Sequence, residues 1–166
     1  KYFLIVSRLV AYKKVDLAIQ AFNQLGLPLK IIGVGREMGR LKKMAGLKIE
    51  FLGQLTDSQL LSYYQNCQAV IFPPEEDFGL VPLEAQGCGR PVIAFGAGGA
   101  LETIIEGKTG LFFKRQTPEA LIEAVRKFRP AEYRSSDCRQ NALKFELGIF
   151  EKKIKEFVEE KWKKAK

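Results

Sequence analysis

Short apolar runs alternate with amphipathic stretches along most of this chain, and this alternation constrains the fold more than any other feature. Six runs are expected to form strands, at residues 3–7, 29–33, 49–52, 69–73, 91–95 and 110–113. Six stretches are expected to form helices, at residues 15–25, 37–45, 57–66, 80–87, 100–106 and 118–128. Strand–helix alternation at this spacing is typical of βαβ units. We therefore predict an α/β fold with a mostly parallel sheet and helices on both faces.

Composition narrows the class of protein. The 166 residues are 46% apolar and 28% charged, as in an ordinary globular domain, and no run of about 18 apolar residues predicts a membrane span. The absence of histidine excludes catalysis by a histidine acid or base. Cys67, Cys88 and Cys138 are few and widely spaced, so we expect reduced thiols in a cytoplasmic protein and no zinc site.

The net charge of +8 is concentrated near the end of the chain. Residues 151–166 hold seven lysines and four glutamates. The simplest interpretation is a solvated helix face, and an anionic membrane surface or a further domain is the alternative. No nucleic-acid-binding motif accompanies the charge, so no nucleic-acid partner is expected.

The segment EDFGLVPLEA carries the chemistry that is easiest to interpret. Glu76 follows an expected strand, and Glu84 lies one to two turns inside the next expected helix. The backbone N–H groups of Gly79, Leu80 and Val81 open that helix, and the start of a helix can bind a phosphate. A carboxylate can accept hydrogen bonds from two neighbouring sugar hydroxyls. This combination of groups suits a nucleotide-sugar.

Two cationic side chains follow the first expected strand. Arg8 and Lys13 come directly after residues 3–7. Ligands of open α/β sheets bind beyond the carboxyl ends of the strands, so both side chains are well placed to meet one. Cations there can stabilise the charge that grows on a departing diphosphate without a metal ion.

These motifs resemble those of a known family. EDFGLVPLEAQGCGRPVIAF resembles the E-x7-E signature of retaining glycosyltransferases of family 4, which have the GT-B fold of two Rossmann-like domains. SRLVAYKKVDLAIQAF, IIGVG, IEFLG, GGALE and KTG resemble further landmarks of that family in the same order. The resemblance covers about residues 2–129 and corresponds to the C-terminal, donor-binding half. It implies that residues 1–166 are one such domain, excised from an enzyme whose N-terminal acceptor domain is absent here.

The resemblance also implies roles for individual residues. Arg8 and Lys13 would hold the diphosphate, Glu76 the hydroxyls of the donor sugar, and Glu84 those of the ribose. The backbone from Phe78 through Gly79 and Leu80 to Val81 would meet the sugar and the phosphates, and Gly53 and Gln54 would border the base. Two positions depart from the family pattern, because Ser7 and Lys14 stand where glycine is usual. The second departure leaves Lys14 as an alternative to Lys13 at the phosphate.

The same resemblance implies the reaction. It is the transfer, with retention of configuration, of a hexose to a glycan or lipid-linked acceptor, with a donor phosphate oxygen taking the acceptor proton. YKKVD, EEDFGLVPLEAQ and GGALETI resemble the mannosyltransferases of bacterial surface polysaccharides, so GDP-mannose is the expected donor and UDP-glucose the alternative. No D-x-D motif is present, and neither a metal nor a cofactor is expected. The isolated domain would be inactive, and its enzyme would lie in the cytoplasm, with the inner face of the plasma membrane as an alternative position.

Other functions fit these residues less well. A glycosidase also uses two carboxylates, but it needs no phosphate site. The Gly33-Val34-Gly35 turn lacks the third glycine of a dinucleotide-binding motif, since Met38 occupies that position. An epimerase or sugar-phosphate synthase of GT-B architecture, and a binding module without activity, remain open.

Towards the C-terminus the pattern changes. Residues 130–140 are less regular, and beyond them five apolar residues recur at helical spacing, namely Phe150, Ile154, Phe157, Val158 and Trp162. We expect this apolar stripe to pack on the domain's own core. The alternative is that it is partly exposed, since the terminal helix of GT-B enzymes often crosses to the other domain.

Overall fold

Six strands form one parallel sheet in the order β3-β2-β1-β4-β5-β6. The computed structural model describes residues 1–164. The strands are β1 (Phe3–Val6), β2 (Leu29–Ile32), β3 (Ile49–Gly53), β4 (Val70–Phe72), β5 (Val92–Phe95) and β6 (Gly110–Phe113). Every strand pair is parallel. The predicted α/β fold is confirmed, and each strand lies within one residue of its expected ends.

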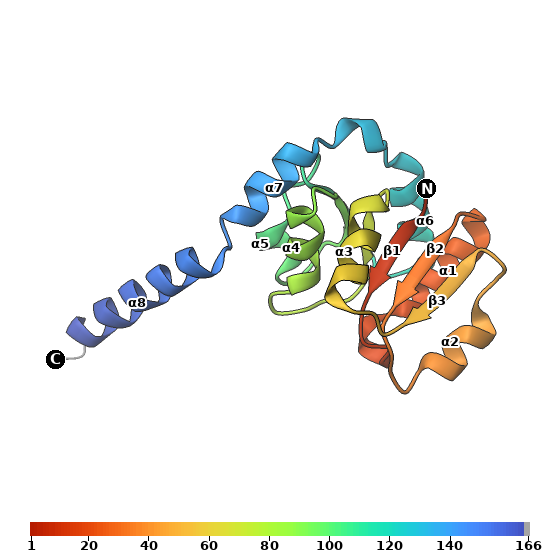
Figure 1. Cartoon of the computed structure of the whole chain (residues 1–166), viewed down its shortest axis with the longest axis horizontal. Helices are drawn as coiled ribbons and strands as arrows, with labels where there is room; N and C mark the ends of the chain where they lie inside the picture. The colour runs from red at the N-terminus through yellow and green to blue at the C-terminus, as the bar shows by residue number, and fades with distance from the viewer. Residues whose placement is uncertain (165–166) are drawn as a thin grey trace.

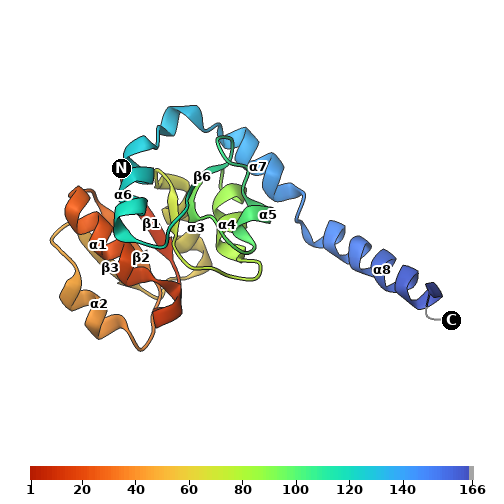
Figure 2. The same cartoon turned by 180° about the vertical axis from the view of Figure 1, so that it is seen from behind.

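Helices cover both faces of the sheet, as predicted (Figures 1 and 2). One face packs against α1 (Val15–Leu25), α2 (Met38–Met44) and α6 (Pro118–Lys127). The other face packs against α3 (Asp57–Asn66), α4 (Leu80–Gly87) and α5 (Ala100–Thr103).

Alternate residues of each strand supply the two cores. Ile5 and Ile71 belong to the core under α1, whereas their neighbours Leu4 and Val70 belong to the core under α3 and α4. Because both sets are fully buried, the central strands read as continuous apolar runs in the sequence.

Helix ends follow the local sequence. Thr56 caps α3 through a capping box with Gln59, and Thr117 caps α6 with Pro118 in the first turn. Two short 3₁₀ helices, η1 (Ala11–Lys13) and η2 (Pro130–Glu132), lie in the connections.

The helix expected at residues 100–106 is shorter, because α5 ends at Thr103. The N–H of Ile105 donates to Thr109 Oγ1 over 2.9 Å, and the N–H of Thr109 donates to the Ile105 carbonyl over 2.8 Å. These bonds close a turn that leads into β6, so the last expected turn of helix does not form.

Part of the region expected to be irregular is a helix, α7 (Ser135–Leu143). The side chain of Asn141 in this helix is buried. Its Nδ2 donates to Gln86 Oε1 of α4 over 2.7 Å and to the Thr103 carbonyl of α5 over 2.9 Å. Tertiary hydrogen bonds therefore hold α7 against α4, although its sequence has little apolar periodicity.

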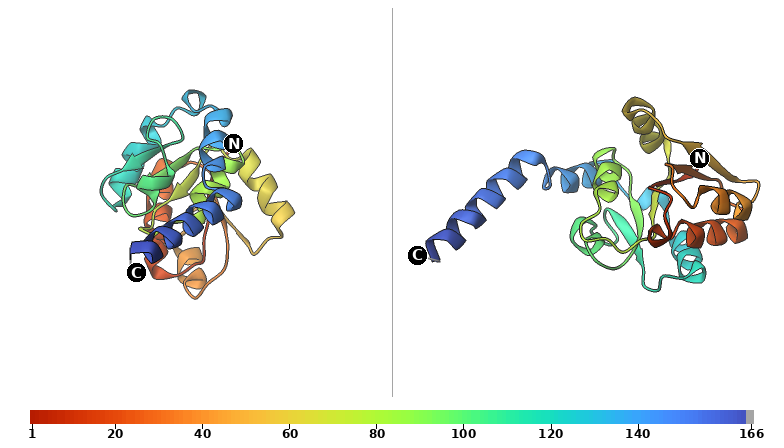
Figure 3. Two further views of the ribbon diagram at one scale, coloured as in Figure 1. Left: turned by 90° about the vertical axis from the view of Figure 1, so that its left-hand side faces the viewer. Right: turned by 90° about the horizontal axis from the view of Figure 1, so that it is seen from below.

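The last helix, α8 (Leu147–Lys164), extends away from the sheet (Figures 1 and 3). It has no buried residue, and the exposed fractions across its apolar stripe range from 47% at Ile154 to 65% at Trp162. The expectation that this stripe packs on the domain's own core is wrong, because the connection after α7 directs the helix outwards. Within residues 1–164, no helix is both long and apolar enough to cross a bilayer.

Candidate functional site

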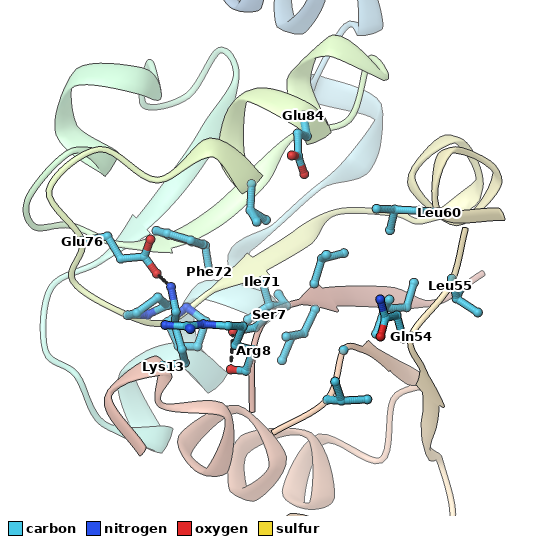
Figure 4. Close-up of a pocket in the computed structure, with 18 residues that line it drawn as sticks. Ser7, Arg8, Lys13, Gln54, Leu55, Leu60, Ile71, Phe72, Glu76 and Glu84 are labelled. Carbon is cyan, nitrogen blue, oxygen red and sulfur yellow. Dashed lines mark hydrogen bonds and ion pairs between the residues drawn. The ribbon is translucent and has the colours of Figure 1, made fainter. Parts of the chain in front are cut away.

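A cavity of about 480 Å³ lies at the carboxyl ends of β1, β2 and β4 (Figure 4). β1 lies between β2 and β4 in the sheet, so the chain winds in opposite directions on the two sides of this point. Such a switch point is where open α/β sheets bind ligands. Six of the ten residues that the sequence assigns to the site line the cavity, namely Arg8, Lys13, Gln54, Glu76, Val81 and Glu84.

The loop after β1 brings two cations to the cavity. Arg8 Nη2 donates a hydrogen bond to Tyr12 Oη over 3.3 Å, and Lys13 Nζ lies 5.0 Å from the centre of the Tyr12 ring. The hydrogen bond from Arg8 is the main reason why the pKa of Tyr12 is lowered. Tyr12 thus contacts both cations, a role that the sequence does not predict because an exposed tyrosine carries no distinctive signal.

Lys13 also forms an ion pair with Glu76, which joins the loop after β1 to the loop after β4 (Figure 4). Both side chains are largely buried, with exposed fractions of 15% and 20%. An ammonium group has three N–H donors, so Lys13 can keep this pair while it donates to a further anion. The pair concentrates both kinds of charge at one side of the cavity.

The backbone that follows β5 packs against the loop after β4 that carries Glu76, called here the Glu76 loop. The N–H of Gly99 donates to the Glu76 carbonyl over 2.8 Å. A Cβ on Gly99 would lie 2.4 Å from the Phe78 carbonyl oxygen, and one on Gly98 would lie 2.3 Å from that of Glu76. Only glycine permits this approach, which gives the GGALE motif a physical role.

On the α4 side of the cavity, the Glu84 carboxylate points from the helix into the cavity (Figure 4). Tyr64 Oη of α3 donates to Glu84 Oε2 over 2.7 Å. Tyr64 is only 3% exposed, and burial, followed by the charge of Glu84, raises its pKa. No sequence motif predicts this contact, although a buried tyrosine hydroxyl generally requires a partner.

Gln54 lies on the opposite side of the cavity from the ion pair, beside the apolar side chains Leu55 and Leu60 (Figure 4). Gly53 ends β3 with a φ of 70° and does not line the cavity, and its carbonyl accepts the Gly33 N–H over 2.8 Å. The cavity is therefore charged at one side and largely apolar at the other.

Three further assigned residues lie at the start of α4 but do not line the cavity. Gly79 is the N-cap, with a φ of 76°, and a Cβ there would lie 2.9 Å from the Phe72 ring. The side chains of Phe78 and Leu80 instead line an apolar groove with Phe145 and the first turn of α8. Only their backbone remains available for the expected role.

The sequence model for the family described as glycosyl transferases group 1 matches residues 1–145 of this chain. The chain belongs to this family. An uncharacterized glycosyltransferase of Methanocaldococcus jannaschii is 31% identical over 127 residues, which cover 74% of this chain and 36% of that protein. The alpha-1,3/1,6-mannosyltransferase ALG2 of Homo sapiens is 36% identical over 115 residues, which cover 66% of this chain and 25% of that protein. This group 1 glycosyl transferase chain thus spans about a third or less of the length of these relatives.

Solved structures share the fold of this group 1 glycosyl transferase domain. Sucrose-phosphate synthase from Thermosynechococcus elongatus has a TM-score of 0.83 and 24% identity, covering 97% of this chain and 45% of that one. HepE of Anabaena in complex with UDP-glucose has a TM-score of 0.79 and 23% identity, covering 96% of this chain and 49% of that one. The Rossmann-like architecture predicted from the sequence is therefore that of GT-B glycosyltransferases.

Proposed function

We propose that this chain is the donor-binding domain of a retaining glycosyltransferase of family 4, and that it binds GDP-mannose for transfer of mannose to a glycan or lipid-linked acceptor. The observation that carries the proposal is the convergence of two cations and two carboxylates on one cavity at the switch point of the sheet. Membership of the glycosyl transferases group 1 supports the reaction class.

The layout of the cavity suggests how the donor binds. Arg8 and Lys13 take the diphosphate, and Glu76, already beside Lys13, takes hydroxyls of the transferred sugar. Glu84 takes the ribose hydroxyls. Gln54 and the apolar side chains near it border the base, with Gly53 fixing the turn that presents Gln54. The α4 start at Gly79 brings backbone N–H groups towards the sugar and phosphates.

The same groups suggest a course for the reaction. As the glycosidic bond breaks, negative charge grows on the leaving diphosphate, and the preorganised cations stabilise it without a metal ion. Glu76 is paired with Lys13 and Glu84 accepts from Tyr64, so neither carboxylate is assigned the role of base. We assign removal of the acceptor proton to a phosphate oxygen of the donor.

The identity of the donor rests on the mannosyltransferase-like motifs and on the relative ALG2, a mannosyltransferase. UDP-glucose is the second candidate, because HepE has a similar fold and was solved with UDP-glucose. Calorimetric titration of this chain with GDP, UDP and ADP at fixed salt tests the choice. We expect GDP to bind more tightly than UDP or ADP. A preference for UDP of more than about tenfold, or roughly 1.4 kcal/mol, would defeat the GDP-mannose assignment and leave the glycosyltransferase proposal standing.

The acceptor is assigned to an N-terminal domain that is not part of this chain. The exposed apolar stripe of α8 supports this, because an apolar face of that length is expected to be covered by another domain. The lysines beside this stripe would also be attracted to the anionic cytoplasmic surface of a membrane, which is the alternative partner for the stripe. On this proposal, the isolated chain binds the donor but transfers no sugar.

Product analysis with the full-length enzyme separates the remaining functions. A new glycosidic bond with the anomeric configuration of the donor supports a retaining glycosyltransferase. An epimerised nucleotide-sugar or a sugar phosphate would instead indicate one of the other GT-B activities. Nucleotide binding without turnover would indicate a binding module.

A further inference from the structure

We infer that Tyr64 is a positioning residue of the nucleotide site, because its hydroxyl fixes the Glu84 carboxylate in the orientation that meets the ribose. The inference rests on the proposed role of Glu84 as the ribose ligand. It deepens that role, because it assigns the discrimination between nucleotides with and without ribose hydroxyls to a pair of residues on two different helices.

One member of the Tyr64–Glu84 pair is buried and the other is exposed. Tyr64 is buried between α3 and the sheet, in the same apolar core as Leu4, Ile32 and Val70. Glu84, by contrast, lies on the exposed side of α4 and lines the cavity. A glutamate side chain on a helix surface has several rotatable bonds, and holding one rotamer costs conformational entropy. The 2.7 Å hydrogen bond ties this mobile carboxylate to a rigid ring.

The hydrogen bond uses only part of the carboxylate. Tyr64 occupies one lone-pair site on Oε2, and a carboxylate offers about four such sites over its two oxygens. Oε1 and the rest of Oε2 remain available for two neighbouring hydroxyls. Burial raises the pKa of the phenol, so Tyr64 keeps its proton and acts only as a donor to Glu84.

The neighbouring tyrosine provides a matched control. Tyr63 lies on the same helix, but its ring packs against Tyr2, with centroids 6.1 Å apart, and under Lys30 Nζ, 5.4 Å from the ring centre. Tyr63→Phe therefore removes an identical hydroxyl group from α3 without touching the Glu84 contact.

The experiment measures the affinity of this 166-residue chain for two nucleotides by calorimetry. The first is the preferred nucleoside diphosphate, which the proposal takes to be GDP. The second is its 2′,3′-dideoxy analogue, which lacks both ribose hydroxyls and so cannot donate to Glu84. We expect Tyr64→Phe to weaken GDP binding by about fivefold to tenfold, the scale of the net contribution of one typical hydrogen bond, and to leave the dideoxy affinity within about twofold. Tyr63→Phe should change neither. In a Glu84→Ala background, Tyr64→Phe should have no further effect on GDP.

The outcomes distinguish this inference from the proposed function. Equal weakening of GDP and the dideoxy analogue by Tyr64→Phe would mean a merely structural role and overturn the inference. Unchanged GDP binding in Tyr64→Phe, together with a loss in Glu84→Ala, would overturn it while leaving the ribose role of Glu84 intact. Unchanged GDP binding in Glu84→Ala would overturn both the inference about Tyr64 and the proposed ribose role of Glu84. Because the readout is a ratio of two ligands in one variant, a modest loss of folded protein does not affect it.

Discussion

The Lys13 ammonium and the Glu76 carboxylate form an ion pair that joins the loop after β1 to the loop after β4. The two residues are 63 positions apart in the sequence, and the parallel sheet brings them together because β1 and β4 are adjacent. The pair couples the cation assigned to the diphosphate with the carboxylate assigned to the transferred sugar. Bond cleavage in a nucleotide-sugar would take place between these two groups.

Removal of either cation should slow catalysis. In the full-length enzyme, Arg8→Ala or Lys13→Ala is expected to lower turnover by about 10²–10³-fold, the range for losing one preorganised donor at developing charge. Lys14→Gly is the control, since it removes an adjacent positive charge and restores the residue usual in the family. Steady-state kinetics checks all three. A loss in Lys14→Gly as large as that in Lys13→Ala would show that Lys14 reaches the phosphate.

Chelation of metal ions should leave activity unchanged. Arg8 and Lys13 are proposed to stabilise the leaving diphosphate themselves, so EDTA is expected to have no effect on the turnover of the full-length enzyme. The assay compares initial rates with and without EDTA, followed by Mn²⁺. Activity that disappears with EDTA and returns with Mn²⁺ would show that a metal supplies the charge stabilisation instead.

Gly99 should tolerate no side chain. The Cβ of Gly99→Ala would lie 2.4 Å from the Phe78 carbonyl oxygen and 2.6 Å from that of Asp77, so the Glu76 loop must move. We expect a loss of about 1–3 kcal/mol in the free energy of unfolding, as for other overpacked sites, together with weaker donor binding. Gly39→Ala is the control, because no atom lies within 4 Å of its Cβ. Equal stability of the two variants in urea titrations would refute this account of the GGALE motif.

Lys14 should be replaceable by glycine with a gain in stability. Its φ of 53° and ψ of 32° are left-handed, and it is the only residue other than glycine with a positive φ among residues 1–164. Lys14→Gly relieves about 1–2 kcal/mol of backbone strain, offset by roughly 0.5–1 kcal/mol of extra chain entropy in the unfolded state. A small rise in melting temperature is expected. A clear fall would mean that the Lys14 side chain contributes more than its backbone costs.

The sequence predicted the sheet and the charged site because both depend on local pattern. The buried strands read as apolar runs, and the rule that ligands bind at the carboxyl ends of strands predicts that Arg8 and Lys13 meet a ligand. Glu76 is assigned to the same site from its position after a strand in the EDFGLVPLEA segment and from the family resemblance. Each of the three lines the cavity. That their roles are those of a donor site stays a prediction.

Features that depend on contacts between distant segments could not be predicted in this way. A tyrosine on the inner face of a helix looks like any core residue, so nothing in the sequence paired Tyr64 with Glu84. The helix α7 was missed because Asn141 is buried through hydrogen bonds to Gln86 and Thr103 rather than through apolar packing. The direction of α8 is set by the connection after α7, whereas its apolar stripe alone suggested packing on the core.

The most direct test of the central claim is the affinity of three forms of this chain for the preferred nucleoside diphosphate. Calorimetry would compare the unmodified chain with Lys13→Ala and Glu84→Ala, each checked for folding by circular dichroism. The account predicts that the unmodified chain binds one nucleotide, and that each substitution weakens binding by about tenfold or more, since each removes hydrogen bonds to a charged group. The same affinity in all three forms, or no binding by the unmodified chain, would contradict the claim that this cavity is the donor site.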